Sequence, residues 1–302
     1  MKYILGVDVG ATKISAALVH NNTISKIITH PTESHLGKKS VIANIIKIIK
    51  VFDNPRVHAI GLGIAGEINQ KKGVLVSSPN MAKDVKNIPI AKILKKEFKK
   101  NIFIENDAKC FALAEGVLGA GKKFDFVVGL TLGTGVGGGI VMHKKLYHGS
   151  QGLAGELGHM TIADNGYLCG CGERGHLEAY ASGTGMTHIY KEYTGKTRDA
   201  FYITNKAREG ETAAKRVIKI MAESLGIGLA NIINMLNPDI IVVGGGMVHV
   251  KALWRPAIAV AKKGVLYPVL KNTHIEKTSL KDGANIFGAA LITQMQNVNI
   301  KM

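Results

Sequence analysis

The chain has 302 residues, enough for two domains of about 150 residues each, and its 46% hydrophobic content with 36 glycines indicates an α/β protein with many tight turns. Three cysteines are too few for a disulfide framework, and the sequence lacks an unbroken run of about 18 apolar residues, which predicts a cytoplasmic protein without a membrane partner. The formal charge of +17 could attract phosphate groups, but the lysines are scattered and form no arginine-rich stripe, so we expect no nucleic-acid partner.

The first half of the chain is predicted to alternate between strands and helices. Residues 6–20 read as a β-hairpin, followed by a third strand near Thr23–His30. The patterns that follow predict helices at Lys39–Phe52, Ile90–Lys99 and Ala108–Leu118 and strands at Val57–Ile64 and Asn101–Glu105. Hairpin strands followed by this alternation indicate a mixed sheet flanked by helices.

The second half is predicted to repeat the first. Residues 129–143 align with residues 6–20 at a constant offset of 123, and residues 238–246 resemble residues 58–66. The predicted elements are strands within 125–147, a cysteine-bearing loop, helices around 178–191 and 212–236, and a strand at 239–245. Two similar units side by side predict a cleft between them, where ligands usually bind.

Glycine turns that follow buried strands are candidate phosphate sites. In LGVDVGATK, the turn at Gly10 brings Asp8, Thr12 and Lys13 beside exposed backbone N–H groups, which predicts a phosphate and magnesium pocket. Similar turns follow in LGTGVGGG and VVGGGM. None has the Walker pattern, and a single turn of this kind is more often structural. Three turns from both halves could together cradle the phosphates of a nucleotide.

Asp107 stands between the strand IFIE and the helix that begins at Ala108, beside Asn106. A structural role as helix N-cap explains both side chains equally well, because Asn and Asp are favoured there. The two roles are compatible. A carboxylate at a helix N-terminus stays ionised, and aimed into a cleft it can accept a hydroxyl proton.

One short loop carries four nitrogen or sulfur donors: His159, Cys169, Cys171 and His176. This is the ligand count of a tetrahedral zinc site, although a CxC pair alone is equally consistent with two plain thiols. Glu156 and Glu178 flank the loop, and Glu156 has a helical-type spacing to His159, so both could face one cavity.

Together these motifs resemble the ROK family, named for repressors, open reading frames and kinases, within the superfamily that contains sugar kinases and actin. The resemblance covers essentially the whole chain. The motifs that carry it are DVGATK near the start, SPN at 78–80, ENDAK at 105–109, LGTGVGGGIV at 132–141, GLAGELGHM at 152–160, CGCGERGHLE at 169–178, ASG at 181–183 and the late IIVVGGG.

The resemblance implies two ribonuclease-H-like (actin-like ATPase) domains, each a mixed five-stranded sheet flanked by helices, with a cleft between them. The domains would be a small one at 1–117 and a large one at 118–287, with the zinc loop 159–176 inserted in the large domain and a C-terminal helix of about 288–302 packed back on the small one. We also expect a homodimer or homotetramer.

The implied activity is ATP-dependent phosphorylation of a hexose, with Mg²⁺ near Asp8 and a structural Zn²⁺. Asp107 matches the catalytic base that activates the sugar 6-hydroxyl. The positions that match sugar contacts are Asn80, Asn106, Asp107, Glu156, His159 and Glu178. The positions that match phosphate turns are Asp8, Gly10, Thr12, Lys13, Gly133, Thr134 and Gly135, with Gly244 and Gly245 near the adenosine.

Two departures from the family pattern bear on this interpretation. The family usually has a third cysteine where this chain has His176, so we predict a zinc site of two histidines and two cysteines; the alternative is a loop held by packing alone. After Asn80 the chain continues MAKDVKN, where glucokinase-like members often have a Gly-Trp pair, which leaves the substrate open.

Glucose is the preferred substrate, because GELGH and the preceding GSQGLA resemble glucokinase-like members. The nearest alternative is a kinase for N-acetylglucosamine or N-acetylmannosamine. A more distant alternative is a sugar-responsive transcriptional regulator. Such regulators carry an N-terminal DNA-binding segment, whereas here the first phosphate turn already begins by Asp8.

Overall fold

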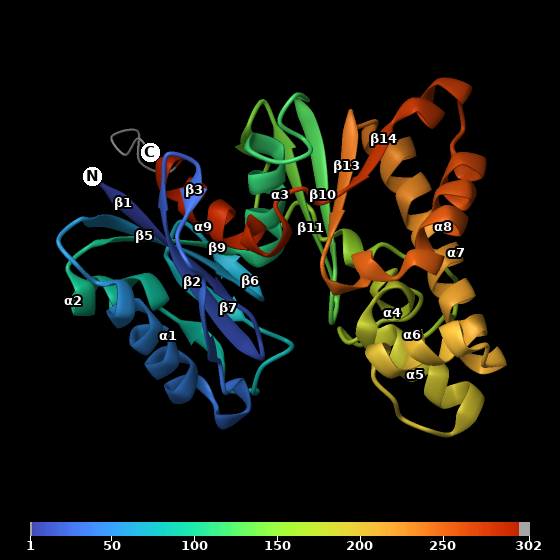
Figure 1. The fold of residues 1–302 in the computed structure, drawn as a ribbon, viewed down its shortest axis with the longest axis horizontal. Helices are drawn as coiled ribbons and strands as arrows, with labels where there is room; N and C mark the ends of the chain where they lie inside the picture. The colour runs from blue at the N-terminus through green and yellow to red at the C-terminus, as the bar shows by residue number, and fades with distance from the viewer. Residues whose placement is uncertain (1, 296–302) are drawn as a thin grey trace. The chain divides into compact units, whose positions relative to one another are not determined.

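Strand β1 (Tyr3–Val9) lies at the centre of the first sheet in the computed structural model, which describes residues 2–295 (Figure 1). It pairs antiparallel with its hairpin partner β2 (Lys13–His20) and parallel with β5 (Val57–Ile64). The remaining strands are β3 (Thr23–Ile24) and β4 (Ile28–Pro31), both on β2, and β9 (Asn101–Asn106), on β5. The sheet therefore has six strands, because the predicted third strand is split into β3 and β4.

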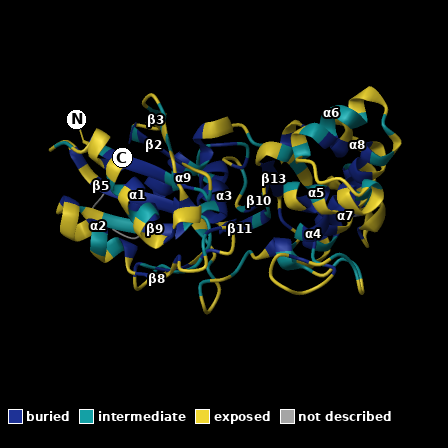
Figure 2. Ribbon diagram, turned by 90° about the horizontal axis from the view of Figure 1, so that it is seen from below, coloured by how far each residue is buried: buried dark blue, intermediate teal, exposed yellow. Residues whose placement is uncertain are grey.

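Helices α1 (Lys38–Phe52) and α2 (Ile90–Phe98) pack with one apolar face on this sheet and expose the other (Figure 2). Helix α3 (Asp107–Val117) is buried on nearly all sides; most of its residues are small or apolar, and the buried Lys109 and Glu115 have hydrogen-bond partners. A small separate sheet of three antiparallel strands was not predicted; it contains β6 (Glu67–Asn69), β7 (Val74–Ser77) and β8 (Lys86–Ile88).

Helix α9 (Ala284–Met295), from the end of the described chain, packs against β1, β5 and α3 at backbone distance. Glycines make this approach possible. A Cβ atom on Gly61 would stand 1.6 Å from the Ala289 carbonyl oxygen, and one on Gly288 would stand 1.9 Å from that of Cys110. The predicted C-terminal helix extended to residue 302, and its residues 296–302 lie outside the described part of the chain.

The second sheet has the strand order β12-β11-β10-β13-β14. Its members are β10 (Phe126–Leu132), β11 (Val136–Met142), β12 (Lys145–Leu146), β13 (Ile240–Gly244) and β14 (His274–Lys277). Here β10 lies between β11 and the parallel β13, as β1 lies between β2 and the parallel β5. The aligned segments of the sequence thus occupy equivalent places in the two sheets.

Five helices belong to the second sheet's unit: α4 (Glu178–Ala181), α5 (Gly183–Thr194), α6 (Ala200–Glu209), α7 (Thr212–Leu236) and α8 (Lys251–Gly264). The predicted helix at 178–191 is broken at Ser182, whose hydroxyl accepts from the Gly185 N–H at 2.9 Å and caps α5. By length and composition α7 could span a membrane, but 67% of its most apolar window is buried, and α7 is a core helix.

Two compact units result from this arrangement. The first contains the chain up to Asp125, Gly139–Ala154 and the chain from Thr278 onward; the second contains Phe126–Gly138 and Gly155–Lys277. The domain bounds 1–117 and 118–287 stay a prediction.

Candidate functional site

The carboxyl ends of three parallel strands in the first unit bring acidic residues together. Asp8 on β1 is in register with Gly63 on β5, and Gly63 is in register with Glu105 on β9. Cys110 lies beside this edge: burial, and then the charges of Glu105, Asp107 and Asp8, raise its pKa well above the ordinary value. The predicted magnesium residue and the predicted base therefore share one edge of the sheet.

Asn106 and Asp107 divide the roles that the sequence left open. The Asn106 side chain is the N-cap of α3 and accepts from the Lys109 N–H at 3.1 Å, whereas Asp107 is the first helical residue. Asp107 Oδ1 accepts one hydrogen bond from Asn106 Nδ2 at 3.2 Å and another from the Ala108 N–H at 3.0 Å. These two donors fix the orientation of the Asp107 carboxyl group.

Asp8 lies at the same sheet edge, and its surroundings act on its pKa in opposite directions. Burial raises the pKa of its carboxyl, while a hydrogen bond from Asn285 Nδ2 at 3.1 Å and the charge of Lys13 act in the opposite direction. A partly buried carboxylate that burial destabilises gains by meeting a cation, and an oxygen donor of this kind suits Mg²⁺.

Two hydroxyl groups hydrogen-bond the backbone carbonyls of the turn at Gly10. Thr32 Oγ1 donates to the Gly10 carbonyl at 2.7 Å, and Ser34 Oγ donates to the Ala11 carbonyl at 2.6 Å. Thr12 and Lys13 are exposed on the same turn. Asn80 is also exposed and lies two residues after Ser78. The Ser78 hydroxyl donates to the Ala65 carbonyl at 2.7 Å, and the carbonyl of the following residue, Gly66, accepts from Asn106 Nδ2 at 3.0 Å. Hydrogen bonds thus link the Asn80 segment to the cap of α3.

The second unit has two glycine turns at the carboxyl ends of the adjacent strands β10 and β13. The turn at Gly133, Thr134 and Gly135 is closed by a 2.9 Å hydrogen bond from the Gly133 N–H to the Gly135 carbonyl. Gly245 has φ of +86°, and a Cβ atom there would stand 2.4 Å from the Leu132 carbonyl oxygen. Because Thr131 is in register with Gly244, the two turns are neighbours.

The four predicted metal ligands gather at one point in the second unit. Their ligand atoms all lie within 4.8 Å of one another. His159 Nδ1 lies 3.4 Å from His176 Nδ1 and 3.8 Å from Cys169 Sγ, and Cys171 Sγ lies 3.2 Å from His176 Nδ1. In tetrahedral zinc sites with ordinary Zn–N and Zn–S bond lengths the ligand atoms lie roughly 3.3 to 3.8 Å apart. The three distances of 3.4, 3.8 and 3.2 Å are close to this range, and the chemistry of the donor set fits zinc.

Burial raises the pKa of the Cys169 thiol to about 12, with the nearby Cys171 and Glu178 as further contributors. Zinc binds the thiolate, so this sulfur needs the compensating charge of a cation to lose its proton. Glu178 links the cluster to the first turn of this unit: its Oε1 lies 3.6 Å from Cys169 Sγ, and its Oε2 accepts from the Val136 N–H at 2.8 Å. Glu156 is exposed at the start of the short helical turn that carries His159.

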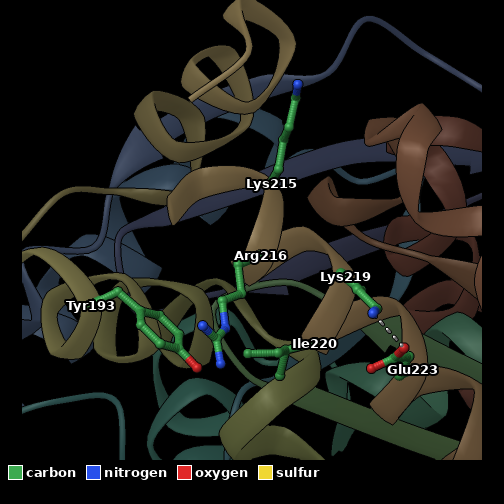
Figure 3. A pocket seen from close by; sticks show the side chains of 6 residues that line it. All are labelled: Tyr193, Lys215, Arg216, Lys219, Ile220 and Glu223. Carbon is green, nitrogen blue, oxygen red and sulfur yellow. Dashed lines mark ion pairs between the residues drawn. The ribbon is translucent and has the colours of Figure 1, made fainter. Parts of the chain in front are cut away.

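Two hollows lie along α7. The smaller, of about 460 Å³, is lined by Tyr193, Arg216 and Glu223 among others; the Arg216 guanidinium lies over the Tyr193 ring, and Lys215 points away from them (Figure 3). The larger, of about 820 Å³, lies between α6, α7 and α8 and has an apolar lining that includes Val250 and Pro256. Val250, one of its lining residues, follows the Gly244–Gly246 turn by only a few residues.

Sequence reasoning missed Glu105, His148 and Asn285. Glu105 stands inside a recognised motif, yet nothing in its spacing predicts the 2.7 Å contact between its Oε2 and His148 Nε2. Asn285 reaches Asp8 across 277 positions of the chain, which no local pattern can indicate.

Comparison with known proteins places this geometry in context. A model described as ROK family matches residues 4–296. A glucokinase of Thermotoga maritima is 34% identical, covering 96% of both chains, and an N-acetyl-D-glucosamine kinase of Haemophilus influenzae is 32% identical, covering 95% of this chain and 98% of that one. A solved ROK glucokinase of Streptomyces griseus in complex with glucose and AMPPNP is 27% identical with a TM-score of 0.84, covering 96% of this chain and 98% of its own.

Proposed function

Since the chain belongs to the ROK family and is an ATP-dependent sugar kinase, we propose that it transfers the γ-phosphoryl group of ATP to the 6-hydroxyl of glucose, as a glucokinase or broad-specificity hexokinase. The observation that supports the chemistry is the placement of Asp107 at the N-terminus of α3, at the same sheet edge as Asp8. The 34% identity to a glucokinase supports glucose as the acceptor.

In the proposed reaction, Asp107 accepts the proton of the sugar 6-hydroxyl while that oxygen forms a bond to the γ-phosphorus. The bond from the γ-phosphorus to the bridging oxygen breaks, and ADP leaves. Asp8 would hold Mg²⁺, which neutralises phosphate charge when it is bound with ATP. The exposed Lys13 and the turns at Gly10, Gly133 and Gly244 supply charge and N–H groups for phosphate oxygens.

The remaining site residues keep the roles that the resemblance gave them. We propose that Asn80, Asn106, Glu156, His159 and Glu178 hydrogen-bond the sugar ring, and that His159, Cys169, Cys171 and His176 hold a structural Zn²⁺. We propose that the protein is cytoplasmic and forms a homodimer or homotetramer. Light scattering on the purified protein tests the oligomeric state.

The base of ATP is proposed to occupy the near end of the large hollow between α6 and α8. This end begins at Val250 and Ala252, a few residues after the Gly244–Gly246 turn. Ala252→Phe should raise the KM for ATP more than about tenfold and leave the KM for the sugar unchanged. Ala259→Phe, at the far end of the same hollow, is the matched control, and equal effects of both variants would remove the base from this place.

A coupled assay with glucose, mannose, N-acetylglucosamine and N-acetylmannosamine tests the acceptor. Glucose should give the highest kcat/KM. The 32% identity to an N-acetyl-D-glucosamine kinase makes that substrate the second candidate, and preferred turnover of an N-acetylhexosamine would replace the first. Sequence-specific DNA binding at physiological salt, with turnover of no sugar, would instead favour the regulator.

Asp107→Asn tests the base. The variant should lose about 10²- to 10⁴-fold in kcat because the amide cannot accept the proton, while its dissociation constant for the sugar changes little. An unchanged kcat would remove Asp107 from this role.

A further inference from the structure

The loop of residues 148–154 is tied at two points to the junction between β9 and α3. His148 Nε2 lies 2.7 Å from Glu105 Oε2, and the buried Lys109 Nζ donates to the Gly152 carbonyl. A hydrogen bond of 3.0 Å from the Ala154 N–H to the His148 carbonyl closes the loop on itself. All of these residues belong to the first unit.

The first tie connects His148 to Asp107 through an unbroken series of contacts. Glu105 Oε1 accepts from the Asn106 N–H at 2.9 Å, and Asn106 Nδ2 donates to Asp107 Oδ1 at 3.2 Å. The Glu105 carboxyl is only 2% exposed, so it cannot replace a lost partner with bulk water. Without His148 the Glu105 carboxyl must turn toward other donors, and this rotation disturbs the hydrogen bond that it accepts from the Asn106 N–H.

Burial distinguishes this pair from a surface ion pair. His143 and Asp125 form a second histidine–carboxylate pair nearby in the chain, at 3.8 Å, but their side chains are 79% and 74% exposed. Such a pair contributes little. In the His148 pair the histidine is 28% exposed and the carboxylate is buried. The exposed pair of His143 and Asp125 is therefore the control for the buried pair.

We propose that His148 is a positioning residue for the phosphoryl transfer, acting through Glu105 and Asn106 to hold the Asp107 carboxylate and the 148–154 loop in place. This inference rests on the proposed function of Asp107. We expect His148 to affect the orientation of Asp107 and not the binding of ATP, because the series of contacts ends at the carboxylate that accepts the proton. Displacement of a catalytic group by even about 1 Å costs on the order of 10²-fold in rate.

Steady-state kinetics of three variants test the proposal. His148→Ala should lower kcat about 10- to 100-fold, as loss of a residue that orients a catalytic group does, with the KM for ATP unchanged. His148→Gln should recover most of this loss, because its side-chain N–H can reach the carboxylate. His143→Ala should retain the wild-type kcat. Equal kcat values for the two alanine variants, or no recovery with glutamine, would overturn the proposal.

A double-mutant cycle tests the route through Glu105. In a Glu105→Ala background, replacement of His148 by alanine should lower kcat by less than about twofold, because no side chain is left at position 105 to connect His148 with Asn106. A full further loss in that background would show that His148 acts by another route and would overturn the proposal.

Amide hydrogen exchange supplies a readout that needs no turnover. Exchange within residues 148–154 should be at least about tenfold faster in His148→Ala than in the wild type, and unchanged in His143→Ala. Unchanged exchange in His148→Ala would contradict the tie itself. If the wild type phosphorylated no sugar, the proposed function would fail, and exchange alone would still decide whether His148 holds the loop.

Discussion

Asp8 shows a conflict between stability and chemistry within one side chain. Burial raises the pKa of its carboxyl, so the folded chain binds that proton more tightly than the unfolded chain does. The contribution of protonated Asp8 to stability is complete below its ordinary pKa and is lost as the pH rises through the raised value. At neutral pH an ionised Asp8 without a cation therefore lowers the free energy of unfolding.

Asp8→Asn should consequently raise the Tm of the metal-free protein at pH 7 while lowering kcat by about 10²-fold or more, because the amide is a poor ligand for Mg²⁺. Thermal unfolding followed by circular dichroism checks the first effect, and the gap to the wild type should narrow as the pH is lowered toward the ordinary pKa of aspartate. A variant less stable than the wild type at pH 7 would contradict this account.

We predict that the cysteine-bearing loop needs His176 to bind the proposed zinc ion. His176→Ala removes one of four converging donors and should lower the zinc bound per chain from about one to well below one half, since closed structural sites use all four ligands. His176→Cys should keep the zinc. Elemental analysis of purified protein measures both, with His188→Ala, an exposed histidine on α5, as the control. Absence of zinc from the wild type would leave the loop to packing alone.

At the scale of elements, Glu115 on α3 hydrogen-bonds two chain segments. Each segment lies close in sequence to a point where the chain leaves or re-enters the first unit. Its carboxyl is fully buried and accepts from the Ala120 N–H at 2.8 Å, from the Leu280 N–H at 3.2 Å and from the Thr278 hydroxyl. Residues 119–121 precede the point after Asp125 where the chain first leaves this unit, and Thr278 begins its last return, which follows the earlier one at Gly139–Ala154.

Glu115→Ala should lower the free energy of unfolding by about 3 kcal/mol, because it leaves several buried donors without their charged acceptor. Urea denaturation monitored by circular dichroism provides the measurement. Glu209→Ala, in which a 59% exposed side chain is truncated, should change stability by less than about 0.5 kcal/mol. Similar values for the two variants would show that the Glu115 contacts do not contribute.

The elements that the sequence predicted well share a local cause. The hairpin, α1 and α7 have a clear apolar pattern and β5 is a nearly continuous apolar run, and their bounds in the structure differ by a few residues at most from the prediction. The wrong predictions arise where hydrogen bonds of single polar side chains interrupt an element. Ser182 stops one predicted helix because its hydroxyl caps the next, and β3 and β4 separate where Ser25 pairs with Leu18 instead of continuing the strand.

The candidate site was predictable to the extent that its residues lie in motifs. Asp107 stands beside Asn106 between a strand and a helix, and the four candidate metal ligands lie within one short loop, so their types and spacing predicted the chemistry. The supporting partners were not predictable, because His148 and Asn285 reach Glu105 and Asp8 from distant segments and have no distinctive spacing.

At the scale of the whole molecule, the two units should respond separately to damage. Gly61→Ala places a Cβ atom 1.6 Å from a carbonyl oxygen of α9, which only a shift of the helix can relieve. We expect a loss of about 3 kcal/mol or more in the first unit. The single tryptophan, Trp254, lies in the second unit, so its fluorescence should keep its wild-type urea midpoint while part of the circular dichroism signal is lost earlier. A shared shift of both signals would show that the units unfold together. Gly246→Ala, where a Cβ atom meets open space, is the control for stability.

Helix α9 covers β1 and β5, although the whole second unit lies between them in the sequence. During translation these two strands are therefore made long before α9, whose backbone packs against Gly6 and Gly61. Until α9 has been made, the apolar surface beside these glycines is a binding surface for chaperones and for other nascent chains.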